Sequence, residues 1–156
     1  EYCTSVRVCW IPVAQVLDSA GNPCLVVFGG HEGVVLSVRL DALGEHVYSG
    51  GVDGTVRKWH IESGECTLVM RGHKGVVWCV DVTLDGMAVF SAGDDGTIKK
   101  WDAETGIELL TLVGHGKDEE GDCAVRCVRI ALDGQVLCSG GEDKTVRLWN
   151  GTTGAS

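Results

Sequence analysis

A repeat of 42 residues constrains the fold of this chain more than any other feature. Gly-His dipeptides begin at Gly30, Gly72 and Gly114, and a serine, an aspartate and a tryptophan follow each of them in the same order. Each tryptophan lies six residues after its aspartate, and each aspartate lies four residues after its serine. A period of this length indicates one structural unit that is repeated and stacked on its neighbours. The recurring residues are His31, Ser49, Asp53 and Trp59; His73, Ser91, Asp95 and Trp101; and His115, Ser139, Asp143 and Trp149.

Alternating apolar residues and turn signals predict four short antiparallel strands in each repeat. In the middle copy these strands cover residues 77–82, 87–91, 97–101 and 108–112. An Asp-Gly pair joins the second and third strands, because glycine readily adopts the positive φ of a tight hairpin turn. The first copy has the same pair, whereas the third has the weaker Asp143-Lys144. A sheet of this size cannot bury its own apolar faces, so each is expected to stack on the next.

The repeated residues resemble those of the WD40 family. The resemblance is carried by Gly-His and by Ser-Gly-Gly-x-Asp-Gly-Thr-Val-Arg-x-Trp with its variants, and it covers residues 24–154. The Trp-Asp pair that names the family occurs at Trp101-Asp102, whereas the other two tryptophans are followed by histidine and asparagine. The resemblance implies an all-β fold made of about three and a half four-stranded antiparallel β-propeller blades.

The number of strands predicts a partial or open propeller. A propeller ring needs at least four blades, so missing sequence or another copy of the chain is expected to complete it. The chain begins with Glu1 in place of methionine, and we expect a processed product or a segment of a longer protein. The predicted divisions are 1–29, a partial blade with an irregular start and a last strand at 24–28; 30–71 and 72–113, two repeats; and 114–156, a repeat with an acidic insertion at 117–122 that lacks its last strand.

Every repeat contains a serine, a histidine and an aspartate, the set that serine hydrolases use. A nucleophilic serine acts at one exposed site beside an oxyanion hole, whereas this set recurs three times. The family resemblance implies instead that the aspartate accepts from the histidine, the histidine contacts the serine hydroxyl, and the serine contacts the indole N–H. The twelve residues named above are therefore predicted to be structural, with a serine hydrolase as the alternative from another class. No cofactor or metal ion is expected.

The composition favours an intracellular protein that binds neither nucleic acid nor membranes. A formal net charge of -9 opposes binding to a phosphate backbone. The basic pairs Arg57-Lys58 and Lys99-Lys100 recur just before a tryptophan and are predicted to be solvated strand faces. The longest early apolar run, residues 8–17, is too short to span a bilayer and lacks a cleavage-site pattern. We expect a cytoplasmic or nuclear protein that is not secreted.

The eight cysteines are predicted to be reduced core residues. The sequence contains no Cys-x-x-Cys pair. Cys123 and Cys127 would lie about 13 Å apart along a strand, too far to share a metal ion. Cys79 and Cys127 occupy equivalent repeat positions, where the first copy has Ser37.

The loops at one end of the blades are predicted to bind the partner. The family resemblance points to the rim that carries the Gly-His loops and the Asp-Gly turns. An aromatic side chain beside two acidic ones there suits a basic or mixed-charge peptide, although the tryptophan could instead be packed between blades. The predicted function is a non-catalytic protein-binding scaffold or adaptor, with a regulatory segment of a larger multidomain enzyme as the alternative. The predicted contact residues are Leu36, Trp78, Arg126, Val52, Asp94 and Glu142.

Overall fold

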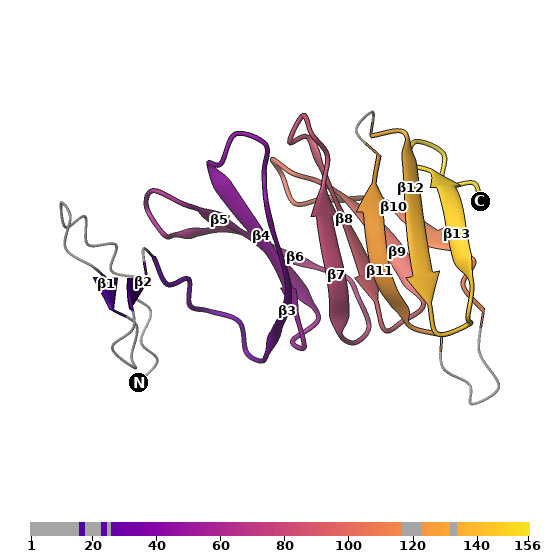
Figure 1. Cartoon of the computed structure of the whole chain (residues 1–156), viewed down its shortest axis with the longest axis horizontal. Helices are drawn as coiled ribbons and strands as arrows, with labels where there is room; N and C mark the ends of the chain where they lie inside the picture. Colours follow the sequence, from indigo (N-terminus) through magenta and orange to yellow (C-terminus); the bar gives the residue numbers. More distant parts are fainter. Residues whose placement is uncertain (1–15, 18–22, 25, 117–122, 132–133) are drawn as a thin grey trace.

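The computed structural model describes residues 16–17, 23–24, 26–116, 123–131 and 134–156, and it shows an open row of antiparallel sheets (Figure 1). Three meandering sheets, here called blades 1, 2 and 3, follow one another along the row. The all-β fold with unclosed blades predicted from the sequence is confirmed. The strands are β3 (Val35–Leu40), β4 (His46–Gly51), β5 (Thr55–His60) and β6 (Cys66–Arg71) in blade 1; β7 (Val77–Val82), β8 (Ala88–Gly93), β9 (Thr97–Asp102) and β10 (Glu108–Val113) in blade 2; and β11 (Val125–Ile130), β12 (Val136–Gly141) and β13 (Val146–Asn150) in blade 3.

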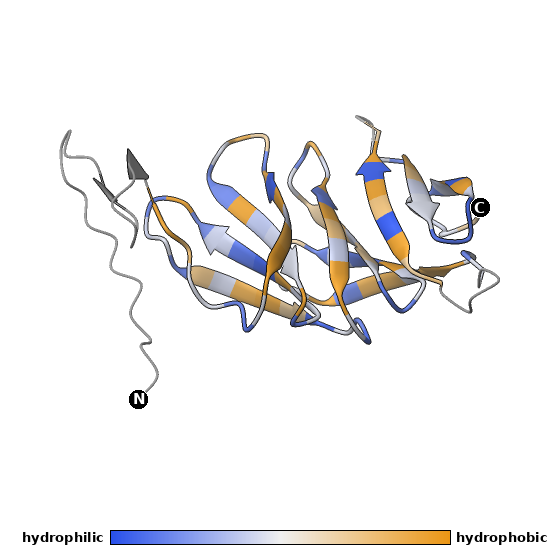
Figure 2. Cartoon of the chain, turned by 60° about the horizontal axis from the view of Figure 1, so that its bottom comes forward, coloured by the Kyte–Doolittle hydropathy of each residue, from blue (hydrophilic) through white to orange (hydrophobic). Residues whose placement is uncertain are grey.

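Two apolar cores lie between the blades, because successive side chains of a strand point to opposite faces of its sheet. The core between blades 1 and 2 includes Tyr48, Met70 and Trp101, and the core between blades 2 and 3 includes Phe90 and Trp149. Figure 2 shows the resulting mixture of hydrophobic and hydrophilic residues along the strands. Each fully buried side chain of this kind contributes about 1.5–3 kcal/mol. Blade 2 is therefore buried on both faces, and it holds its two neighbours in place.

The hairpin turn between the second and third strands of each blade needs a residue with positive φ. Gly54 and Gly96 supply it in blades 1 and 2, with φ values of 73° and 75°. In blade 3 the residue is Lys144, which adopts a φ of 63° and is the one non-glycine with positive φ among the described residues. The side chain at this position makes the backbone conformation less favourable. The weaker turn predicted for the third copy thus keeps the same geometry.

Polar side chains also cross between blades. Asp81 of β7 accepts from Arg39 of β3 at 2.8 Å and from the backbone N–H of Ile130 in β11 at 3.0 Å, so one carboxylate contacts all three blades. Lys58 and Lys100 donate to backbone carbonyl groups of the following blade, both at short distances (3.0 Å and 2.9 Å). The prediction of solvated basic pairs is wrong, because the two ammonium groups bond the neighbouring blade and lie near the Tyr48 and Phe90 rings. Their partners Arg57 and Lys99 are buried as well, at 9% and 8% exposure.

The N-terminal part differs from the expected strand over residues 24–28. The structure contains β1 (Val16–Leu17) and β2 (Pro23–Cys24), which pair with each other and with no blade. Residues 26–28 form no strand, since no strand of the described chain lies beside them to complete a ladder. Phe28 instead contacts Trp59, with the ring centroids 5.9 Å apart. Residues 1–15 of the expected irregular start and the acidic insertion at 117–122 lie outside the described residues.

The cysteine at the repeated inner-strand position is buried in one blade and exposed in the next. Cys79 is 5% exposed, and its thiol lies 3.5 Å from the Val128 carbonyl oxygen of blade 3. Cys127 holds the same position in blade 3 and is exposed, so the prediction of a core residue is wrong there. The reason is positional, because none of the described sheets packs on that face of β11. The same sequence position therefore has a different environment at the end of the row.

Replacing Gly50 of β4 with alanine is expected to lower the free energy of unfolding by about 1–3 kcal/mol. A Cβ atom at Gly50 would lie 2.5 Å from a Val77 methyl carbon and 2.9 Å from a Val80 methyl carbon, inside the core between blades 1 and 2. Gly140 is the matched control, because it holds the same repeat position in blade 3 and its Cβ would meet nothing within 4 Å.

Gly140→Ala is expected to leave stability unchanged or to raise it by up to about 1 kcal/mol, since alanine restricts the unfolded chain. Urea unfolding followed by circular dichroism measures both variants. Equal losses of stability in the two variants would contradict the difference in packing between these faces.

Candidate functional site

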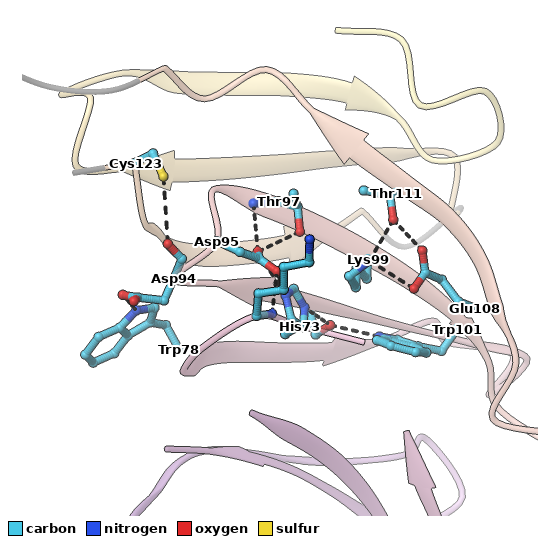
Figure 3. A network of polar contacts seen from close by, with 12 residues as sticks. His73, Trp78, Asp94, Asp95, Thr97, Lys99, Trp101, Glu108, Thr111 and Cys123 are labelled. Atoms are coloured by element: carbon cyan, nitrogen blue, oxygen red, sulfur yellow. Dashed lines mark hydrogen bonds and ion pairs between the residues drawn. The ribbon is translucent and has the colours of Figure 1, made fainter. Parts of the chain in front are cut away.

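Blade 2 contains a chain of four hydrogen-bonded side chains that joins a loop, a turn and two strands (Figure 3). Trp101 Nε1 donates to Ser91 Oγ at 2.8 Å, and the same oxygen lies 2.7 Å from His73 Nε2. His73 Nδ1 lies 3.1 Å from each carboxylate oxygen of Asp95. A neutral histidine with its proton on Nδ1 satisfies every contact, because Nε2 then accepts the serine proton while Nδ1 donates to the aspartate. Each donor thus meets one acceptor along the whole chain.

The other two blades contain the same chain of contacts. Each histidine ring also lies about 6 Å from the tryptophan of its own blade. The loop that follows His115 carries the insertion, yet its histidine keeps both partners. In blade 1, His31 lies 2.9 Å from Asp53 and 2.7 Å from Ser49, and the Trp59 indole donates to Ser49 at 2.8 Å. In blade 3, His115 lies 2.9 Å from Asp143 and 2.6 Å from Ser139, and the Trp149 indole donates to Ser139 at 2.7 Å.

The aspartate in each turn is held in its charged form. Burial of Asp95 favours the neutral acid, but hydrogen bonds from His73, from the backbone N–H of Lys74 and from Thr97 outweigh it and hold the pKa of Asp95 well below its usual range. The Thr97 hydroxyl donates at 2.7 Å and the Lys74 N–H at 2.9 Å. Burial also raises the pKa values of Asp53 and Asp143, but hydrogen bonds of the same kinds outweigh it and lower both. The carboxylate therefore fastens the Gly-His loop to the hairpin turn.

The serines of these networks are inaccessible. Ser49, Ser91 and Ser139 are 3%, 0% and 3% exposed, and each hydroxyl is bonded to both a histidine and a tryptophan. Burial with two bonds per hydroxyl leaves no direction from which a substrate could approach. Each network instead rigidifies its own blade, at about 0.5–1.5 kcal/mol per hydrogen bond.

Four of the six predicted rim residues contact one another across blades 2 and 3. Trp78 Nε1 donates to Asp94 Oδ1 at 3.1 Å, and both side chains lie together in Figure 3, on the far side of Asp95 from Trp101. The guanidinium carbon of Arg126 lies 3.7 Å from the centre of the Trp78 ring. Arg126 also donates to Glu142, through Nε at 2.8 Å and through Nη2. This group of four side chains, Trp78, Asp94, Arg126 and Glu142, is here called the rim cluster.

The other two predicted rim residues belong to blade 1 and stand apart from these contacts. Leu36 of β3 is 38% exposed, and Val52 of the turn between β4 and β5 is 46% exposed. Trp78 is half-buried, and the Arg126 side chain of the next blade stacks on its ring. The repeat positions identified these six residues as partner contacts, and that role stays a prediction. They gave no signal for the stacking of Arg126 on Trp78, because that contact depends on how far one blade is rotated from the next.

Metal ligands do not gather anywhere in the described ranges: no three His, Cys, Asp or Glu side chains there are placed to hold an ion. Five cysteines in the same described ranges are free thiols: Cys66, Cys79, Cys123, Cys127 and Cys138. The part of the chain with described coordinates has no helix that is long and apolar enough to cross a membrane.

The fold and its networks define a class of protein. Consecutive meanders of four, four and three strands that share a buried histidine ring, serine and tryptophan with an aspartate in the turn are blades of one repeat type. Three segments of the sequence, residues 22–60, 64–102 and 106–150, match the family described as WD domain, G-beta repeat. These segments cover more than half of the chain, which therefore belongs to the WD40 family. The second segment combines β6 of blade 1 with β7, β8 and β9 of blade 2, so a sequence repeat links two neighbouring blades.

The chain is also similar to part of several named proteins. It is 39% identical over 54 residues to "Ribosome biogenesis protein BOP1 homolog" of Arabidopsis thaliana and 44% identical over 54 residues to the protein of the same name from Oryza sativa subsp. japonica. It is 55% identical over 54 residues to "Ribosome biogenesis protein erb1" of Neurospora crassa. Each match covers 35% of this chain, and 7%, 8% and 7% of these relatives in that order. The chain thus spans less than a tenth of their length.

Proposed function

We propose that this chain is a non-catalytic protein-binding scaffold or adaptor that holds a protein or peptide partner on the rim formed by the Gly-His loops and the Asp-Gly turns. The observation that carries the proposal is the rim cluster, where an aromatic side chain, an arginine and two carboxylates meet at the ends of two blades. Aromatic and arginine side chains supply most of the energy at protein interfaces. The blades below hold the strand ends and turns that carry these side chains at one rim.

The absence of catalysis is part of this proposal, and the buried networks support it. A serine hydrolase needs a nucleophile that a substrate can reach, whereas Ser91 is fully buried between His73 and Trp101. The described residues outside the networks bring no second serine and histidine together in a hydrogen-bonded pair except His60 and Ser63. That pair closes a surface turn through the backbone of Ser63 and has no aspartate beside it.

The charge of the chain favours a partner with basic segments. The formal net charge is -9, and Asp94 and Glu142 bring carboxylates to the rim cluster. Nucleic acid would be repelled by such a surface. We place the protein in the cytoplasm or the nucleus, where its thiols stay reduced. The alternative, a regulatory segment of a larger multidomain enzyme, uses the same rim.

A role in ribosome biogenesis is a second candidate, since the matched relatives carry that name. The similarity spans 54 residues, a little more than one repeat, so it supports the type of repeat more strongly than the pathway. The rim proposal does not depend on this role.

Replacing Trp78 with alanine is expected to reduce partner capture by about 30-fold, as for a central interface residue. Its free energy of unfolding is expected to change by less than about 1 kcal/mol, as for a surface position. The measurement is quantitative affinity capture with tagged protein, followed by urea unfolding of the same samples. Leu43→Ala is the matched control, because Leu43 is 81% exposed in the turn between β3 and β4, at the opposite end of blade 1. Unchanged capture together with a large loss of stability would show that Trp78 is a core residue.

A further inference from the structure

We infer that Arg126 occupies, from within its own chain, a site for a partner's arginine that is formed by Trp78, Asp94 and Glu142. In this view Arg126 blocks the site in the free protein, and a partner must displace it. The inference rests on the proposed function, since it names the chemistry of the same rim.

The contacts around the Arg126 guanidinium are those that recognise an arginine. Its central carbon lies 3.7 Å from the centre of the Trp78 ring, a stacking distance, and the ring face attracts a cation. Its Nε and Nη2 atoms both donate to the same Glu142 oxygen, Oε1, so two guanidinium donors share one charged acceptor. Asp94 accepts the indole N–H at 3.1 Å and fixes the ring orientation. The aromatic face and the carboxylate are thus already arranged for a planar cation.

Arg126 is the member of this cluster that can leave. Its side chain is 43% exposed, and it contacts the Trp78 ring and Glu142. The cations that hold the blades together behave differently. Lys58 and Lys100 donate to backbone carbonyl groups between blades, and Arg57 is buried beside its own Asp53. Rotation of Arg126 into water breaks contacts of the rim alone.

The repeat supports this reading. The position of Arg126 in blade 3 is that of Trp78 in blade 2 and of Leu36 in blade 1, so the side chain there varies while the blade remains the same. Leu36 is 38% exposed at the equivalent position of β3, and it takes no part in the contacts of the rim cluster. The guanidinium contacts in blades 2 and 3 therefore identify an arginine as the ligand that this rim fits.

The experiment measures binding of two blocked tripeptides, Leu-Arg-Leu and Leu-Gln-Leu, to the 156-residue chain by NMR titration. The indole N–H signal of Trp78 is the readout, assigned by its absence in Trp78→Phe. Arg126→Ala is expected to tighten binding of Leu-Arg-Leu by about tenfold. An intramolecular competitor reduces the apparent affinity in proportion to the fraction of sites that it leaves free, so a tenfold gain corresponds to Arg126 occupying about nine-tenths of the sites. Binding of Leu-Gln-Leu is expected to change less than twofold.

Two further variants separate the site from general electrostatics. Lys74→Ala removes one positive charge from the Gly-His loop at the same rim without touching the cluster, and it is expected to change the affinity for Leu-Arg-Leu less than twofold. Arg126→Ala combined with Glu142→Gln is expected to lose the gain. A gain below about fivefold in Arg126→Ala would overturn the inference, as would an equal gain in Lys74→Ala or for the neutral peptide. Each of these failures leaves the proposed function standing, because that is tested by capture of whole partners with Trp78→Ala.

Discussion

Trp101→Ala is expected to lower the free energy of unfolding by about 3–5 kcal/mol, the cost of removing a buried tryptophan. Trp101 is 1% exposed and packs with Tyr48 and Met70 in the core between blades 1 and 2. The truncation leaves a cavity in that core and removes the indole donor from Ser91. Because whole domains are stable by about 5–15 kcal/mol, a loss of this size removes about a third or more of the stability of a typical domain. Urea unfolding of the purified variant measures it.

Two controls divide this effect into packing and hydrogen bonding. Trp101→Phe retains an aromatic ring and loses the N–H donor, and it is expected to cost about 1–2 kcal/mol. Trp78→Ala removes the same side-chain type from the rim and is expected to cost less than about 1 kcal/mol. A loss of stability for Trp78→Ala that equals the loss for Trp101→Ala would contradict the assignment of Trp101 to the core and Trp78 to the surface.

The repeat in the sequence was sufficient to predict the blades because it carries both the period and the turns. The hairpin turns at Gly54 and Gly96 follow from the need for positive φ, and they set the register of β4 with β5 and of β8 with β9. The burial of the three tryptophans follows from their fixed offset from the turn. Local pattern and tertiary packing agree at these positions, so sequence reasoning works there.

Sequence reasoning failed where the environment depends on the neighbouring blade. Cys79 and Cys127 are identical in type and repeat position, yet one is buried and the other exposed. Lys58 and Lys100 were expected on a solvated strand face, but each donates a hydrogen bond to the next blade. No pattern within one repeat reveals that bond. The stacking of Arg126 on Trp78 is of the same kind. Contacts within a repeat are encoded locally, whereas contacts between repeats require the angle between blades.

Asp95→Asn is expected to lower the free energy of unfolding at pH 7 by about 1.5–3 kcal/mol, the value of hydrogen bonds to a charged group. Asp95 accepts from His73, Thr97 and the Lys74 backbone, and an amide side chain cannot accept at both of its terminal atoms. Asp94→Asn removes the same charge one residue earlier, on an exposed side chain, and is expected to cost less than about 1 kcal/mol.

The cost of Asp95→Asn is also expected to depend on pH. The pKa of Asp95 is lowered in the folded chain, because its hydrogen bonds outweigh the opposing effect of burial. An aspartate in the unfolded chain has a pKa of about 3.9. The stability that the carboxylate supplies is therefore complete above about pH 5 and is lost progressively as the pH falls toward the lowered pKa of the folded state. Urea unfolding at pH 7, 5, 4 and 3 should show the difference between wild type and Asp95→Asn shrinking below about pH 5. A difference that stays constant across this range would mean that the charge of Asp95 contributes nothing and that the loop is held by the shape of the side chain alone.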